Sequence, residues 1–104
     1  MISSHEIKRL NWSEIRARVT GPRMSVHATL LGMGRSATTR EVAEALRWSV
    51  LTVRPRVTEL IQLGYVECVG RRDGEGLYRA RDEREAHAAH AASLADRITQ
   101  PNLL

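Results

Sequence analysis

The chain has little of several residue types that define common protein classes. Its 104 residues include one cysteine, no phenylalanine and few aromatic side chains of any kind. A single cysteine, Cys68, cannot form an intramolecular disulfide, which excludes a small secreted disulfide scaffold. Without phenylalanine, the core must be built mainly from aliphatic side chains. We expect Cys68 to be a small buried residue, because it alternates with Val66 and Gly70 along a strand-like stretch.

Long apolar segments are also missing. No apolar run approaches the ~18 residues of a transmembrane helix. The first ten residues carry acidic and basic side chains instead of the apolar centre of a secretory signal. We therefore expect a cytoplasmic protein.

No motif of an active site or a cofactor site is recognisable. The sequence contains no nucleophile–base arrangement, no P-loop and no paired carboxylates in a cleft-forming context, so we expect neither an enzyme nor a cofactor. Glu83, His87 and His90 share one face of the last expected helix, and such a row can bind a transition metal. Because no further ligand cluster accompanies them, we expect a solvated helix face and no metal.

Charge and length favour one basic domain. A chain of 104 residues suits a single core, and its net charge of +4 is compatible with a polyanionic partner. The basic residues are arginines except for Lys8. A GC-rich genome would also favour arginine over lysine, so the abundance of arginine is not by itself evidence for DNA binding.

The first third of the chain predicts two helices separated by Gly21-Pro22. Residues 3–20 are expected to be helical, although Ser13 can start a new helix after a break near Asn11. Their apolar stripe consists of Ile7, Leu10, Ile15 and Val19. Residues 23–33 are expected to form the first helix of the main domain, with a buried face of Met24, Ala28 and Leu31, to which Leu30 can be added.

Two further helices are expected in quick succession. Thr38 or Thr39 caps a helix over residues 39–46, whose inward residues are Val42, Ala45 and Leu46. Arg47-Trp48 forms a turn. Ser49 then caps a helix over residues 50–63 that ends at Gly64, and its expected inward face is Val50, Val53, Val57, Leu60 and Ile61.

A hairpin and a last helix complete the chain. Tyr65–Arg71 and Leu77–Ala80 alternate as strands do, and the residues between them, Arg72-Asp73-Gly74-Glu75-Gly76, are turn formers. Residues 82–98 are rich in alanine and charged residues, which favours a helix. This order is typical of a winged helix-turn-helix. The expected fold class is mainly α with a small β-hairpin, divided into an N-terminal extension (1–22), a winged domain (23–80) and a C-terminal helix and tail (81–104).

The segment over residues 24–80 resembles winged helix-turn-helix regulators of the MarR/ArsR-like type. The residues that carry the resemblance are Thr38–Leu46, Ser49, Thr52-Val53-Arg54, Glu59-Leu60 and Leu63-Gly64-Tyr65-Val66. The chain departs from that pattern at Arg47-Trp48, where a Gly-Leu turn is usual, and at Pro55 inside the recognition helix. Thr52-Val53-Arg54-Pro55-Arg56 is also similar to a stretch in small phage-encoded winged-helix proteins.

The resemblance implies a sequence-specific regulator that binds double-stranded DNA. Residues 49–63 would be the recognition helix in the major groove, and residues 70–77 the wing on the backbone. On a helical wheel, Leu51, Thr52, Pro55, Glu59 and Gln62 point outward, with Arg54 and Arg56 at the edges. The candidate DNA-binding residues are Thr39, Arg40, Ser49, Leu51, Thr52, Arg54, Pro55, Arg56, Thr58, Arg71 and Arg72.

Three alternatives stay open at the level of sequence. Pro55 either contacts DNA or only marks a helix that starts near Thr52. The charges of Arg71, Arg72, Asp73 and Glu75 nearly cancel, which also fits an ordinary solvated turn. The outward face of residues 51–62 can also serve as an apolar protein-docking patch, as in a phage-encoded inhibitor or adaptor.

The terminal helices predict a homodimer. A stripe of Ala88, Ala91, Leu94, Ala95 and Ile98 runs along the last expected helix. A small winged domain has little spare core against which to bury this stripe as well as the N-terminal one. The resemblance likewise favours dimers built from terminal helices.

Overall fold

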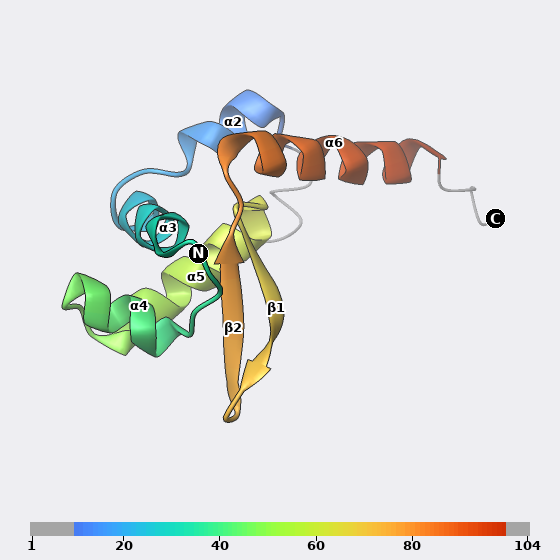
Figure 1. Cartoon of the computed structure of the whole chain (residues 1–104). Coiled ribbons are helices and arrows are strands. Elements are labelled where there is room, and N and C mark those ends of the chain that lie inside the picture. The colour runs from blue at the N-terminus through green and yellow to red at the C-terminus, as the bar shows by residue number, and fades with distance from the viewer. Residues whose placement is uncertain (1–9, 100–104) are drawn as a thin grey trace.

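The computed structural model describes residues 10–99 of the chain, with side chains to residue 93. The elements in chain order are α2 (Trp12–Ala17), α3 (Pro22–Met33), α4 (Thr39–Leu46), α5 (Val50–Leu63), β1 (Val66–Arg72), β2 (Glu75–Ala80) and α6 (Glu83–Thr99). Helices α3, α4 and α5 pack together beside the β1–β2 hairpin, and α6 extends away from them (Figure 1). The expected winged helix-turn-helix with extra terminal helices is confirmed.

The N-terminal segment has a break at Asn11, which was the alternative to one helix over residues 3–20. The Asn11 side chain accepts the N–H of Glu14, and the Glu14 carboxylate accepts the N–H of Asn11. This capping box starts helix α2 at Trp12. Residues 3–9 lie outside the described part. Ile15 of α2 is buried within the main core, so this part of the N-terminal stripe packs inside the chain's own domain.

The buried face of α3 is only partly the expected one. Leu30 is buried as expected, together with Val26, whereas Met24 and Leu31 are 52 % and 45 % exposed and Ala28 is also exposed. The face of α3 that carries Arg23 and His27 points into the domain, where both side chains have polar partners. Arg23 donates to Glu59, and His27 lies 2.6 Å from the carbonyl oxygen of Arg81. Both partners are distant in sequence, so local periodicity does not reveal them.

Short-range signals place the helix-turn-helix correctly. Thr38 and Glu41 form a capping box at the start of α4, and the Ser49 hydroxyl accepts the N–H of Leu51 at the start of α5. Between them Arg47 adopts a left-handed conformation with φ of 59°, which turns the chain within two residues. Gly64 ends α5 in the same region of φ.

The inward faces of α4 and α5 are partly as expected. The residues that are buried are Val42 and Ala43 in α4, and Val53, Val57, Glu59, Leu60 and Leu63 in α5. Ala45, which was expected inside, is exposed, and Ile61 is 39 % exposed.

The hairpin is longer and its turn tighter than expected. β1 and β2 pair antiparallel out to Arg72 and Glu75, and only Asp73-Gly74 lie between them. Both turn residues have positive φ, 52° and 82°, as a type I′ turn requires. Cys68 is exposed, contrary to the expectation that it is buried. After Val66, β1 leaves the core, and a bulge between Cys68 and Gly70 breaks the register.

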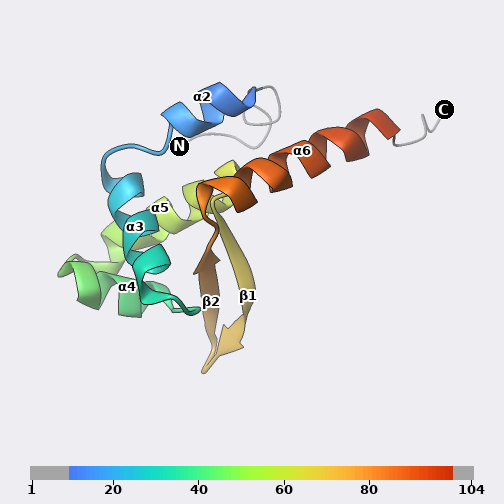
Figure 2. The same ribbon diagram turned by 45° about the horizontal axis from the view of Figure 1, so that its top comes forward.

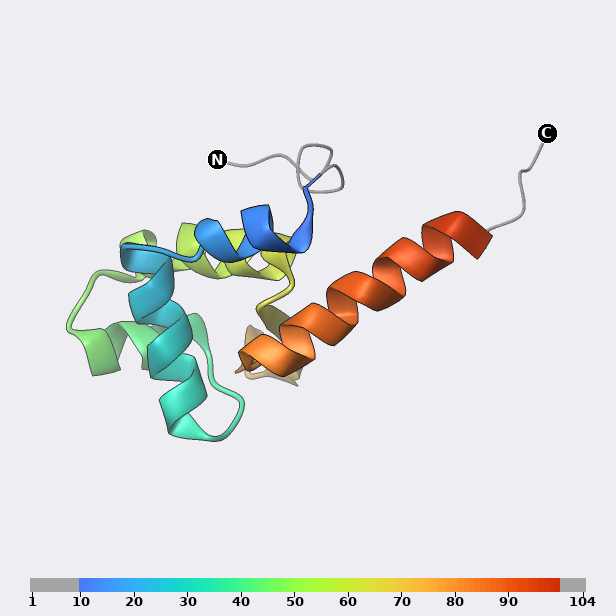
Figure 3. The same cartoon turned by 90° about the horizontal axis from the view of Figure 1, so that it is seen from above.

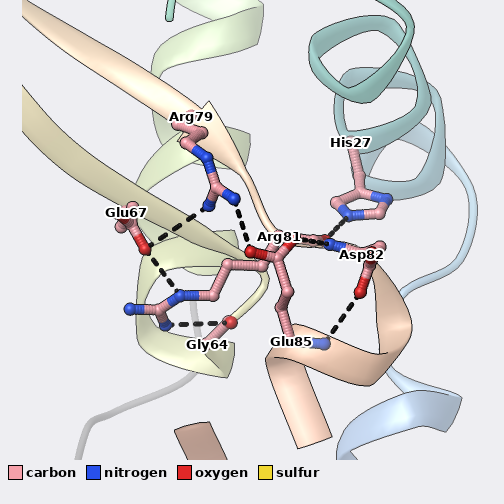
Figure 4. Close-up of polar contacts among 7 residues, drawn as sticks. All are labelled: His27, Gly64, Glu67, Arg79, Arg81, Asp82 and Glu85. Carbon is pink, nitrogen blue, oxygen red and sulfur yellow. Dashed lines mark hydrogen bonds and ion pairs between the residues drawn. The ribbon is translucent and has the colours of Figure 1, made fainter. Parts of the chain in front are cut away.

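A polar junction fixes the direction in which α6 leaves the domain. Arg81 donates to Glu67 and to the carbonyl oxygen of Gly64, and Arg79 pairs with Glu85 in the first turn of α6 (Figure 4). The indole of Trp12 stacks on His87 with ring centroids 4.8 Å apart. The rest of α6 projects past the other elements, as the view from above shows (Figure 3).

A buried carboxylate ties α3 to α5. Glu59 is only 2 % exposed, and its oxygens accept from Arg23 at 2.9 Å and from Arg56 at 3.0 Å. Arg23 also donates to the carbonyl oxygen of Arg18 in the segment before α3. A buried charge is tolerated only when it is paired and hydrogen-bonded, and Glu59 meets both conditions.

Replacing Glu59 with Ala should destabilise the fold. The change removes hydrogen bonds to two charged partners, so we expect a loss of roughly 1.5–3 kcal/mol in the free energy of unfolding. Urea denaturation followed by circular dichroism measures this. The matched control is Glu44→Ala on exposed α4 surface, which should change stability by less than about 0.5 kcal/mol. Equal effects of the two substitutions would contradict a stabilising role for the Glu59 cluster.

Candidate nucleic-acid interface

Helix α5 and the hairpin border a shared hollow. It has a volume of about 310 Å³, and the residues that line it include Thr39, Arg54, Thr58, Arg71, Gly76 and Tyr78. Helix α4 and the hairpin tip lie on the side of the domain away from α2 (Figures 1 and 2). Four of the residues predicted as DNA contacts, Thr39, Arg54, Thr58 and Arg71, are therefore brought together from α4, α5 and β1.

The first turns of α5 present an exposed face. Leu51 is 78 % exposed, and Thr52 and Arg54 are exposed beside it. The Thr58 hydroxyl donates to the carbonyl oxygen of Arg54 one turn back, at 3.2 Å. Arg54 makes no ion pair with any described residue, so its guanidinium retains its full donor set for a partner.

Arg56 and Glu59 do not lie on this outward face. The helical wheel placed Glu59 outward and Arg56 at the edge, but Glu59 is buried and Arg56 binds it at 2.8 Å. The cause is Arg23 on α3, which supplies a second cation and turns this polar side of α5 inward. The geometry thus gives Arg56 a stabilising contact within the domain.

Pro55 lies inside α5, and the helix starts at Val50, not near Thr52. A proline has no N–H, so the carbonyl oxygen of Leu51 loses its usual donor four residues on. Leu51 belongs to the exposed first turn, where water can replace that donor. Pro55 itself is half-buried. The alternative in which Pro55 marks the helix start is wrong.

The two wing arginines have different surroundings. Arg71 lines the hollow and donates to the carbonyl oxygen of Gly74 at 2.6 Å. Arg72 instead reaches helix α4 and donates to Glu41, also at 2.6 Å. Arg40, the other predicted contact on α4, pairs with Glu75 of the wing at 3.4 Å.

Sequence reasoning missed Tyr78 and Gly76 as parts of the hollow. A side chain of even one carbon at Gly76 would meet the hydroxyl of Tyr78 at 2.5 Å, so the Tyr78 ring lies close over this glycine. The two residues are two positions apart on one strand and therefore share a face. That spacing was the available signal in the sequence.

Glu41 is the most perturbed acid of this surface. Its carboxylate accepts the backbone N–H of Thr38 at 3.0 Å and contacts both Arg72 and Arg35. The Thr38 hydrogen bond, with the arginine contacts added, lowers the pKa of Glu41 to about 2. The side chain therefore remains an anion, able to hold both arginines, far below neutral pH.

The last helix, α6, carries two histidines and a glutamate in one row, a pattern that can bind a transition metal. Across residues 10–99, histidine, cysteine and acidic side chains do not converge in a group able to hold a metal ion. His87 and His90 lie against Trp12, at centroid distances of 4.8 and 6.0 Å. None of the helices in that range has the length and apolar character needed to cross a membrane.

Solved structures with the same fold include MarR family proteins. A mutant of MarR from E. coli aligns over 93 % of this chain and 77 % of its own, with a TM-score of 0.57 and 15 % identity. A MarR family regulator from Neisseria meningitidis aligns over 83 % of this chain and 65 % of its own, with a TM-score of 0.53 and 22 % identity. No protein-family model matches the sequence, and no curated protein matches it. At these identities the likeness shows a MarR-like winged-helix fold.

Replacing Arg72 with Gln should raise the pKa of Glu41 from about 2 toward its ordinary 4.5, because one cation is lost while the Thr38 hydrogen bond stays. The folded-state pKa is depressed, so the stabilising contribution is complete above pH 4.5 and is lost as the pH falls toward 2. Nuclear magnetic resonance (NMR) titration of the Glu41 carboxyl carbon measures the pKa. Arg84→Gln, at an exposed position on α6, is the control. A wild-type midpoint near 4.5 would refute the contact.

Proposed function

We propose that the protein binds double-stranded DNA as a sequence-specific transcriptional regulator. Helix α5 enters the major groove, and the β1–β2 hairpin contacts the sugar–phosphate backbone. The observation that carries the proposal is the exposed start of α5, where Arg54, which has no ion pair with a described residue, lines the same hollow as Arg71 of the wing.

Each exposed group suits a DNA contact. An arginine can bind guanine O6 and N7 with two donors, and the Leu51 side chain or the Thr52 methyl can contact thymine methyl groups. Arg71 is suited to phosphate, where contacts fix the position of the protein without reading sequence. The name of one structural neighbour, a MarR family regulator, agrees with this proposal.

A protein-docking role is the second candidate, favoured by one observation. Leu51 is an apolar side chain with 78 % exposure at the most accessible end of α5. A gel-shift assay against random genomic duplex fragments at two salt concentrations separates the two functions. DNA binding that weakens steeply with salt supports the regulator, because phosphate contacts release counterions. No retarded fragment at low salt would refute it and leave the docking role.

Arg54 and Arg56 should behave differently when each is replaced with Ala. Arg54→Ala should weaken binding by roughly 1–3 kcal/mol and relax specificity at one base pair, with unfolding unchanged. Arg56→Ala should instead lower thermal stability, because it removes a partner of buried Glu59. Gel-shift titration and thermal denaturation of both variants test this. Unchanged affinity in the Arg54 variant would remove α5 as the reading helix.

We also propose a homodimer joined through α6. The helix projects beyond the other described elements, and Ala88 and Ala91 of its predicted stripe are exposed. The side chains of Leu94, Ala95 and Ile98 lie outside the described set. Ile15 is buried in the domain core and Leu10 and Val19 pack against that core, so the described part of the N-terminal stripe does not support the interface. Two recognition helices would then read an inverted repeat with half-sites roughly 34–36 Å apart.

Replacing Leu94 and Ile98 together with Glu should convert the dimer to a monomer, since charged side chains oppose burial in an interface. Light scattering at micromolar concentration measures the mass of the full chain and of the variant. Replacing exposed Ser93 with Glu is the matched control and should leave the mass unchanged. A wild-type mass of one chain at this concentration would exclude the dimer.

A further inference from the structure

Two ion pairs connect helix α4 to the wing. Arg72 of β1 donates to Glu41, and Arg40 of α4 pairs with Glu75 of β2. The pairs have opposite polarity, because α4 supplies the acid in one and the base in the other. Together they hold both strands, on either side of the Asp73-Gly74 turn, against one helix.

Glu41 is the centre of this connection. Its Oε1 accepts from the Thr38 backbone and from Arg72, and its Oε2 lies 3.2 Å from Arg35 in the loop after α3. The same loop bonds to β2 through Ala37, whose N–H and carbonyl oxygen pair with Tyr78 at 2.9 and 2.8 Å. One carboxylate therefore contacts the loop, the start of α4 and the wing.

We propose that Glu41 is a positioning residue that holds the wing at a fixed angle to the recognition helix. Arg72 is its partner in this role, and we call the Glu41–Arg72 pair the clamp. Arg71, in contrast, contacts DNA. The inference rests on the proposed DNA-binding function and specifies how the site is built. Arg71 lines the hollow beside Arg54, whereas the Arg72 guanidinium is engaged by a carboxylate. A wing held at one angle lets α5 and Arg71 reach the same duplex together, which favours the sequence that fits both.

The substitution Glu41→Gln isolates the clamp from the folding of α4. A glutamine oxygen can still accept the Thr38 N–H, because Glu and Gln both complete a capping box. The charge that holds Arg72 and Arg35 is lost. Glu44→Gln removes one negative charge from the same helix at an exposed position that has no ion pair with a described residue. It therefore controls for the increase in DNA affinity that follows from the loss of one negative charge alone.

The binding experiment uses the full chain and two duplexes. One is selected by the wild-type protein from a random pool, and the other is unrelated but equal in length and base composition. Glu41→Gln and Arg72→Gln should each weaken binding to the selected duplex roughly threefold to tenfold, and the double variant should be no worse than either, as expected for a coupled pair. Binding of Glu41→Gln to the unrelated duplex should not fall. Glu44→Gln should leave the ratio of the two affinities unchanged.

Two binding results would overturn the proposal. In the first, Arg72→Gln weakens binding to both duplexes equally and reduces, by about one, the slope of log affinity against log salt concentration. Arg72 would then itself be a phosphate contact. In the second, Glu41→Gln strengthens binding to both duplexes as much as Glu44→Gln does. Glu41 would then act only as a negative charge that repels DNA.

A measurement without DNA separates this proposal from the proposed function. The heteronuclear NOE of the Asp73 and Gly74 amides reports fast motion of the wing tip. It should fall in Glu41→Gln and Arg72→Gln and stay at the wild-type value in Glu44→Gln. If the wild type selects no duplex, the proposed function fails and the NOE values alone decide the clamp. Unchanged NOE values in all three variants would refute it.

Discussion

The arrangement of the helices depends on the charge of Glu59. A carboxylate with 2 % exposure needs cations and hydrogen bonds around it, and α3 and α5 supply one arginine each. This requirement sets the rotation of α3, because Arg23 must face α5. It also sets the rotation of α5, because Arg56 must face inward with Glu59. Arg54, two residues before Arg56 in the helix, then faces the hollow beside the wing.

Pairing between acids and arginines concentrates positive charge at the proposed interface. Glu41 and Glu75 engage Arg35, Arg72 and Arg40, and this part of the surface is close to neutral. Glu75 also lines the hollow, but it pairs with Arg40, whereas Arg54 and Arg71 line it without a described acidic partner. A chain of modest net charge can therefore have a local positive potential where α5 and the wing meet. The attraction of a DNA duplex depends more on this local potential than on the net charge of the protein.

Local signals in the sequence predicted where helices and strands begin and end. Contacts between residues far apart in the sequence determine which face of each helix is buried. The caps at Thr38 and Ser49 and the stop at Gly64 depend on neighbouring residues, so their types were sufficient. The buried face of α3 was predicted correctly only at Leu30, because Arg23, which turns this helix, has its partner 36 residues away. Of the residues that line the candidate site, the sequence predicted Thr39, Arg54, Thr58 and Arg71 but not Tyr78, whose position depends on how the hairpin folds back.

The bulge in β1 also affects the behaviour of the molecule in concentrated solution. Within residues 10–99, β1 pairs only with β2, so its other edge offers backbone N–H and carbonyl groups to any passing strand. A regular edge of this kind is a template for intermolecular sheets. The shift between Cys68 and Gly70 interrupts the row of donors and acceptors, and Arg71 and Arg72 place charge beyond it. The wing can thus project from the domain while resisting strand-to-strand aggregation.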